Sequence, residues 1–91
     1  MKILITGGCG FLGSNLAQHG INSGYEVVIV DNFYRLGSKR NFDWLKTQGK
    51  FNFYETDIAN YEEIKKVFHS EMPNFVFHLA GQTAMTTSLN T

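Results

Sequence analysis

Short apolar segments alternate along the chain with segments whose apolar residues recur at helical spacing. The apolar segments span residues 2–6, 26–30, 51–55 and 75–80, and each predicts a strand. The second is a run of β-branched residues, which is typical of a parallel strand that is covered on both faces. Alternation of strands and helices predicts a parallel sheet with right-handed crossovers, helices on both faces and the strand order 3-2-1-4.

The helical segments lie between these strands. In the first, the apolar residues are Leu12, Leu16, Ala17 and Ile21, and two glycines, Gly20 and Gly24, are predicted to end the helix. The segment from Phe33 to Arg40 predicts a loop, followed by a helix over about residues 41–48 that Gly49 closes.

The third helix has the clearest start. Asn60 can cap it, and Glu63 follows three residues later, as in a capping box. Its inward side is predicted to carry Ile64, Val67 and Phe68. Residues 1–91 therefore predict one α/β domain without an internal linker: the N-terminal portion of a doubly wound Rossmann fold.

A glycine cluster follows the first strand. The run from Gly7 to Gly13 reads G-x-G-x-x-G from Gly8 and G-x-x-G-x-x-G from Gly7. Glycines permit a tight turn, the close approach of a pyrophosphate and close helix–strand packing. The following helix N-terminus offers N–H groups and a positive dipole end to phosphates. The cluster predicts dinucleotide binding.

Asp31 narrows the choice of dinucleotide. It lies at the end of the second strand, where a carboxylate can accept hydrogen bonds from both hydroxyls of an adenosine ribose and would repel a 2′-phosphate. The position therefore favours NAD over NADP. Arg35 argues the other way, because arginine can accept that phosphate; beside Asp31 we expect it over the adenine or near the pyrophosphate side of the loop. The alternative interpretation of Asp31 is a turn aspartate.

These motifs resemble the extended short-chain dehydrogenase/reductase family, and within it the nucleotide-sugar epimerases and dehydratases. The resemblance is carried by the run from Thr6 to Gly13, then by Asp31-Asn32, Asp57-Ile58 and His78-Leu79-Ala80-Gly81-Gln82. The segment from Gly81 to Ser88, with Trp44-Leu45, is similar to the CDP-paratose 2-epimerases.

The resemblance implies a role for each matching residue. It places Gly7, Gly10, Phe11 and Leu12 at the pyrophosphate, Asp31 and Asn32 at the ribose, Asp57 and Ile58 at the adenine edge, and Leu79, Ala80 and Gln82 beside the nicotinamide half. Two alternatives stay open: Asp57 as a helix-start residue, and Leu79 and Ala80 as ordinary core residues.

The resemblance also implies the chemistry of a full-length enzyme. That enzyme would be an NAD-dependent nucleotide-sugar epimerase that inverts C2 of CDP-paratose through a keto intermediate, in the synthesis of lipopolysaccharide O-antigen. The alternatives are a dehydratase or 4-epimerase of the same family, and a non-catalytic dinucleotide-binding fragment. The family's catalytic Tyr-x-x-x-Lys pair and its Ser or Thr lie later than Thr91, so no catalytic residue is expected here. We expect the chain alone to be inactive and to bind NAD only weakly.

Other residues are weaker candidates for a catalytic role. Tyr61 and Lys65 form a literal Tyr-x-x-x-Lys, but they lie in the third helix, away from the expected hydride transfer. Cys9 stands at a helix N-terminus, which can lower a thiol pKa, yet a small residue that fits the loop is the simpler interpretation. His78, on an apolar strand, is expected to be a hydrogen-bonded core histidine.

Charge and composition argue against several other classes of protein and site. The formal net charge is zero, which gives no indication of a nucleic-acid or membrane partner. One cysteine excludes an internal disulfide, no histidine spacing suggests a metal site, and no apolar run is long enough to span a bilayer. A cytoplasmic protein is expected. The apolar fourth strand predicts that the isolated chain self-associates, and a homo-oligomer is an open alternative for the full enzyme.

Overall fold

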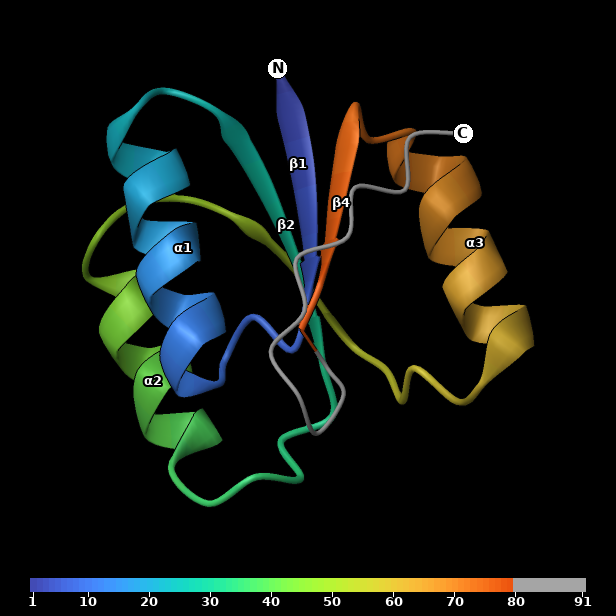
Figure 1. Cartoon of the computed structure of the whole chain (residues 1–91), viewed down its shortest axis with the longest axis horizontal. Coiled ribbons are helices and arrows are strands. Elements are labelled where there is room, and N and C mark those ends of the chain that lie inside the picture. The colour runs from blue at the N-terminus through green and yellow to red at the C-terminus, as the bar shows by residue number, and fades with distance from the viewer. Residues whose placement is uncertain (80–91) are drawn as a thin grey trace.

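The computed structural model describes residues 1–79 and contains a parallel sheet flanked by helices (Figure 1). In chain order its elements are β1 (Lys2–Thr6), α1 (Phe11–Asn22), β2 (Glu26–Asp31), α2 (Ser38–Lys46), β3 (Asn52–Glu55), α3 (Tyr61–Glu71) and β4 (Phe75–His78). The strand order is β3-β2-β1-β4, with every pairing parallel, so the predicted topology is confirmed.

Successive residues of β1 point to opposite faces of the sheet, and this alternation creates two cores. On one face Ile3 and Ile5 pack with Ala17 of α1 and Leu45 of α2. On the other face Leu4 packs with Val67 of α3. Figure 1 shows α1 and α2 on one side of the sheet and α3 on the other, as the sequence predicted.

Two helix boundaries differ from the predicted ones. Gly20 lies inside α1, which continues to Asn22, and it is a packing residue because a Cβ there would lie 2.9 Å from Ile3 Cδ1. The prediction that Gly20 ends the helix is therefore wrong. The second helix begins at Ser38, earlier than predicted, because the buried Ser38 hydroxyl donates to the carbonyl of Arg35 at 2.7 Å and closes a turn there.

The predicted start of α3 is confirmed. Asn60 Oδ1 accepts a hydrogen bond from the backbone N–H of Glu63 at 3.2 Å. The backbone N–H of Asn60 donates to the carbonyl of Asp57 at 2.8 Å, so its partner is the preceding turn rather than Glu63. Val67 is buried on the inward side of this helix, and Ile64 and Phe68 are partly buried beside it, also as predicted.

Glu71 ties α3 to the sheet near the amino ends of the strands. Its carboxylate accepts hydrogen bonds from Tyr54 Oη at 2.5 Å and Lys2 Nζ at 3.1 Å, with Asn52 Nδ2 at 3.3 Å from Oε2. The hydrogen bond from Tyr54 is the main cause that lowers the pKa of Glu71 below its ordinary value, and Lys2 adds to it. The same bond raises the pKa of Tyr54. This network is structural and lies away from the strand carboxyl ends.

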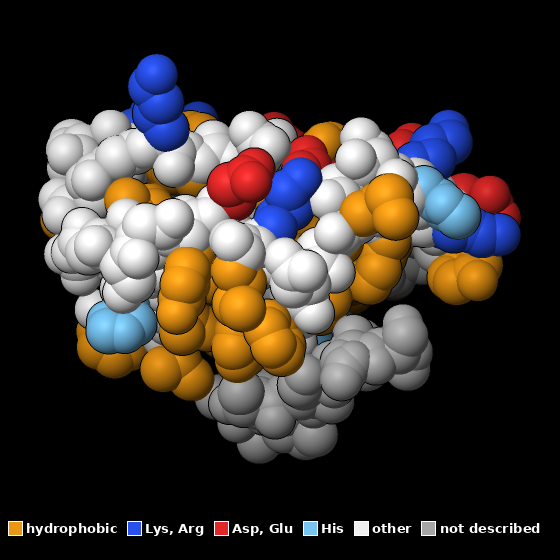
Figure 2. Space-filling model, turned by 90° about the horizontal axis from the view of Figure 1, so that it is seen from above, with side chains coloured by type: hydrophobic (Ala, Val, Ile, Leu, Met, Phe, Trp, Pro, Cys, Tyr) orange, Lys and Arg blue, Asp and Glu red, His pale blue; other side chains and the backbone are white. Residues whose placement is uncertain are grey.

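An apolar groove runs between β4 and α1. Its lining includes Ile3, Leu16, Tyr25, Phe75 and Phe77. Figure 2 shows hydrophobic side chains gathered on the face of the molecule at which the strands begin. Because β4 pairs only with β1 among the described strands, one edge of this apolar strand is open in residues 1–79.

Candidate functional site

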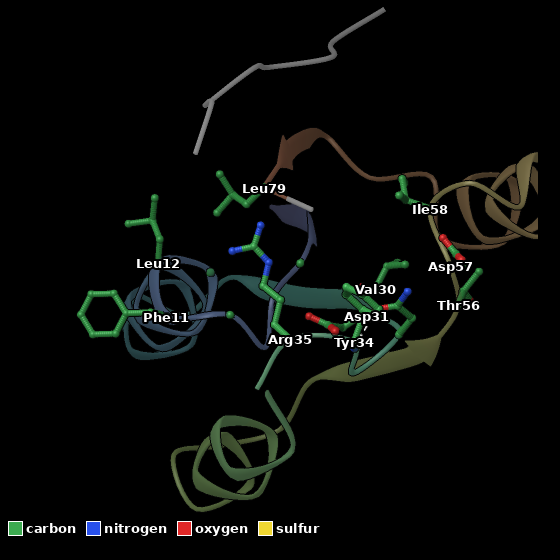
Figure 3. A pocket seen from close by; sticks show the side chains of 14 residues that line it. Phe11, Leu12, Val30, Asp31, Tyr34, Arg35, Thr56, Asp57, Ile58 and Leu79 are labelled. Atoms are coloured by element: carbon green, nitrogen blue, oxygen red, sulfur yellow. Dashed lines mark hydrogen bonds between the residues drawn. The ribbon is translucent and has the colours of Figure 1, made fainter. Parts of the chain in front are cut away.

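A cleft of about 240 Å³ lies at the carboxyl ends of the strands, between the start of α1 and the segments that follow β2 and β3 (Figure 3). Every site residue that the sequence predicted within residues 1–79 lines it: Gly7, Gly10, Phe11, Leu12, Asp31, Asn32, Arg35, Asp57, Ile58 and Leu79. Two further predicted site residues, Ala80 and Gln82, lie outside the described residues. In a parallel sheet this edge is where ligands bind.

The lining also contains residues that were not predicted to contact a ligand. These are Gly13, Val30, Tyr34 and Thr56. Each is adjacent in the sequence to a predicted residue or belongs to the glycine motif, so its position in the sequence could have identified it as a lining residue. Tyr34 precedes Arg35, and Thr56 precedes Asp57.

The glycine loop turns tightly against the sheet. Gly7 adopts a positive φ of 73°, its N–H donates to Val30 at 2.7 Å, and its carbonyl accepts from the N–H of Gly10 at 3.0 Å. A Cβ at Gly13 would collide with the carbonyl oxygen of Gly7. Only glycine therefore lets the first turn of α1 pack directly on the loop, as the spacing predicted.

No side chain of α1 itself caps the start of this helix. Its N-cap residue is Gly10, which makes no side-chain cap hydrogen bond, and the first turn has no acidic residue. The first N–H groups of a helix have no partner within it. Together with the helix dipole, this terminus is suited to binding an anion.

The first turn of α1 contributes two exposed side chains to the cleft. Leu12 is 47% exposed and Phe11 beside it is 83% exposed, and both line the cleft. Farther along the helix, Ala17 is fully buried in the core, and Leu16 and Ile21 are partly buried against it.

Asp31 organises the loop that follows β2. One carboxylate oxygen accepts from the backbone N–H of Cys9 at 2.9 Å, and the other accepts from that of Phe33 at 2.7 Å. Phe33 takes a left-handed φ of 59°, and Tyr34 then donates its N–H to Asn32 Oδ1 at 3.0 Å. These turns bring Tyr34 and Arg35 to the cleft, and Figure 3 shows the Arg35 side chain projecting into it.

The opposite wall consists of the segment between β3 and α3. Asp57 Oδ1 accepts from the backbone N–H of Ala59 at 2.9 Å, so Asp57 shapes the turn that leads to the helix. It also lines the cleft with Ile58. The two interpretations of Asp57, helix-start residue and cleft residue, are thus compatible.

A hydrogen bond joins the carboxyl ends of β1 and β4. Thr6 Oγ1 lies 2.7 Å from His78 Nδ1, which confirms the predicted hydrogen-bonded histidine, and the ring is partly buried. The N–H of Leu79 donates to the carbonyl of Thr6 at 2.9 Å. This pairing holds Leu79 in the wall of the cleft, where it is both a buried residue and a lining residue.

The remaining candidates do not supply a reactive group. Cys9 is fully buried, and burial, with the nearby charge of Asp31, raises the pKa of its thiol to about 12. Tyr61 is 68% exposed and does not line the cleft; Lys65 Nζ lies 5.2 Å from its ring centroid. Among residues 1–79, no cluster of three potential metal ligands occurs. No helix in the same range is long and apolar enough to cross a membrane.

Comparisons with known proteins show the family of the chain. A family model described as GDP-mannose 4,6 dehydratase matches residues 4–91. The CDP-paratose 2-epimerase of Salmonella typhi is 48% identical over 90 residues, which are 99% of this chain and 27% of that protein.

Solved structures of nucleotide-sugar enzymes are also similar to the chain. The UDP-glucose 4-epimerase of Thermotoga maritima, determined with UDP-glucose, has a TM-score of 0.77 and 38% identity over 91% of this chain and 25% of its own. WbmG of Bordetella bronchiseptica, determined with NAD and UDP, has a TM-score of 0.76 and 31% identity over 91% of this chain and 26% of its own. The chain spans about a quarter of the length of the relatives it matches.

Proposed function

The chain belongs to the GDP-mannose 4,6-dehydratase family, and from that premise we propose that it is the cofactor-binding part of an NAD-dependent nucleotide-sugar epimerase. The proposed substrate is CDP-paratose, inverted at C2 through a keto intermediate. The observation that carries the proposal is the meeting of Asp31 and the uncapped start of α1 in one cleft. The 48% identity to the Salmonella typhi epimerase supports the choice of sugar.

The cleft fits the parts of NAD in order. The start of α1, at Gly10 and Phe11, would hold the pyrophosphate, because its N–H groups and dipole face the cleft without a capping side chain. Asp57 and Ile58 would lie at the adenine edge, and Leu79 would border the nicotinamide half. When bound, NAD accepts and returns a hydride, while the protein supplies binding and orientation.

Asp31 has capacity left for a ribose. Each carboxylate oxygen can accept two hydrogen bonds, and within the described residues each accepts one, from Cys9 and from Phe33. The remaining lone pairs suit the two ribose hydroxyls of NAD, with Asn32 beside them. A 2′-phosphate would instead meet the negative charge at close range, so the proposal favours NAD over NADP even with Arg35 in the cleft.

The contribution of residues 1–79 is binding rather than proton transfer. Cys9 is held protonated by burial, and Tyr61 lies outside the lining of the cleft. The proposal therefore assigns no catalytic residue to this part of the chain. It extends to a cytoplasmic enzyme that acts on a nucleotide sugar in O-antigen synthesis.

The alternatives are a dehydratase or 4-epimerase of the same family, and a non-catalytic dinucleotide-binding fragment. A substrate panel with the longer enzyme that contains this segment separates them. Conversion of CDP-paratose to CDP-tyvelose supports the proposal, whereas reaction only at C4 or loss of water from the sugar supports one of the related enzymes. Dinucleotide binding without turnover of any nucleotide sugar supports the fragment.

A further inference from the structure

Asn41 contacts the glycine loop from outside the cleft. It lies in the first turn of α2, is partly buried and does not line the cleft. Its side-chain Nδ2 donates to the backbone carbonyl of Cys9 at 2.8 Å. The two residues are 32 positions apart, so this bond joins two separate elements of the fold.

Cys9 is consequently held on both sides of its backbone. Its N–H donates to Asp31 at 2.9 Å, and its carbonyl accepts from Asn41. Its side chain is fully buried in the core under α1 and α2. The next residue, Gly10, is the N-cap of α1, so the orientation of the Cys9 carbonyl influences where that helix begins.

Helix α2 provides a rigid support for Asn41. Leu45 is fully buried in the same core, and Phe42 packs against it. Asn15 makes a chemically similar bond, because its Nδ2 donates to the carbonyl of Phe11 at 2.7 Å, but that bond stays within α1 and is exposed. Asn15 is therefore a matched control: it has the same amide donor and a nearby carbonyl, without a link between elements.

We propose that Asn41 is a positioning residue that fixes the glycine loop at Cys9 and thereby holds the start of α1 in the conformation that receives a pyrophosphate. Asn41 acts through Cys9 and does not touch the ligand. That Asn41 fixes the loop is inferred from the hydrogen bonds of Cys9 alone. Its consequence for ligand affinity rests on the proposed function.

Residue-resolved hydrogen exchange of the ligand-free chain tests the loop directly. One neutral hydrogen bond changes an opening equilibrium by about fivefold, so Asn41→Ala should accelerate exchange of the Cys9 and Gly10 amides by about that factor. Asn15→Ala should leave them unchanged. Asn41→Asp keeps the shape but places a charged acceptor against the Cys9 carbonyl, so it should accelerate exchange of these amides at least as much as Asn41→Ala does. Equal acceleration throughout the chain, no local acceleration, or loss of the fold in both Asn41 variants would overturn the proposal.

Ligand titrations followed by amide chemical shifts then separate the two proposals. Asn41→Ala should weaken the binding of ADP, which carries the pyrophosphate, by about fivefold, and should weaken the binding of adenosine by a smaller factor. An equal loss for both ligands would mean that Asn41 has only a general structural role. If the wild-type chain binds neither NAD nor ADP, the proposed function fails, while the exchange experiment still decides the role of Asn41.

Discussion

Substitution of Gly13 by alanine tests whether the cleft depends on direct contact between α1 and the glycine loop. An added Cβ would lie 2.9 Å from Gly8 Cα and 3.0 Å from the carbonyl carbon of Gly7, and would collide with the Gly7 oxygen. These are backbone atoms, so the helix and loop must separate. Overpacking of this kind costs up to about 3 kcal/mol, and replacing a helical glycine by alanine returns about 1 kcal/mol.

Gly20→Ala is the matched control in the same helix. Its Cβ would lie 2.9 Å from Ile3 Cδ1 and 3.1 Å from Val27 Cγ2, which are ends of side chains that can shift. We expect Gly13→Ala to lower the free energy of unfolding by about 2 kcal/mol and Gly20→Ala to change it by less than about 1 kcal/mol. Urea denaturation followed by circular dichroism measures both. Equal stabilities of the two variants would refute this reasoning.

Three further predictions concern other parts of the fold. The Cys9 thiol, with a pKa of about 12, should not react with a thiol reagent at pH 8 until the chain unfolds; rapid labelling of the folded chain would disagree. Glu71→Gln should destabilise the chain by about 1–3 kcal/mol at neutral pH. Tyr54 and Lys2 lower the folded-state pKa of Glu71. The ionised carboxylate therefore stabilises the fold above the ordinary carboxyl pKa, and this contribution is lost as the pH falls through the lowered value. The denaturation midpoints of wild type and variant should consequently converge in acid. The open apolar edge of β4 should make the 91-residue chain self-associate, and Phe75→Lys should reduce this in light scattering after size exclusion; a monodisperse wild-type monomer would argue against it.

The sheet was predictable because its information is local. Each strand is a short apolar run, and each crossover contains a helical pattern. The order β3-β2-β1-β4 is the one expected of the doubly wound fold that the glycine motif indicates. The glycine spacing located the start of α1, and strand ends located Asp31 and Asp57 at one edge of the sheet. These features follow from the periodicity of the apolar residues and from positions along the chain, and both can be read from a single sequence.

The parts that were missed depend on tertiary contacts. In the sequence Gly20 has the pattern of a helix terminator. In the structure it lies inside the helix, where the Ile3 side chain leaves no room for a Cβ. The bond from Asn41 to Cys9 connects distant residues and has no periodic signal.

Calorimetric titration of the chain with NAD and with NADP tests the central claim most directly, because it asks whether the cleft at Asp31 and α1 binds the proposed cofactor. We predict saturable binding of NAD that is weaker than micromolar, still weaker binding of NADP, and a reduced preference in Asp31→Asn. Absence of NAD binding, or a preference for NADP, would contradict the account.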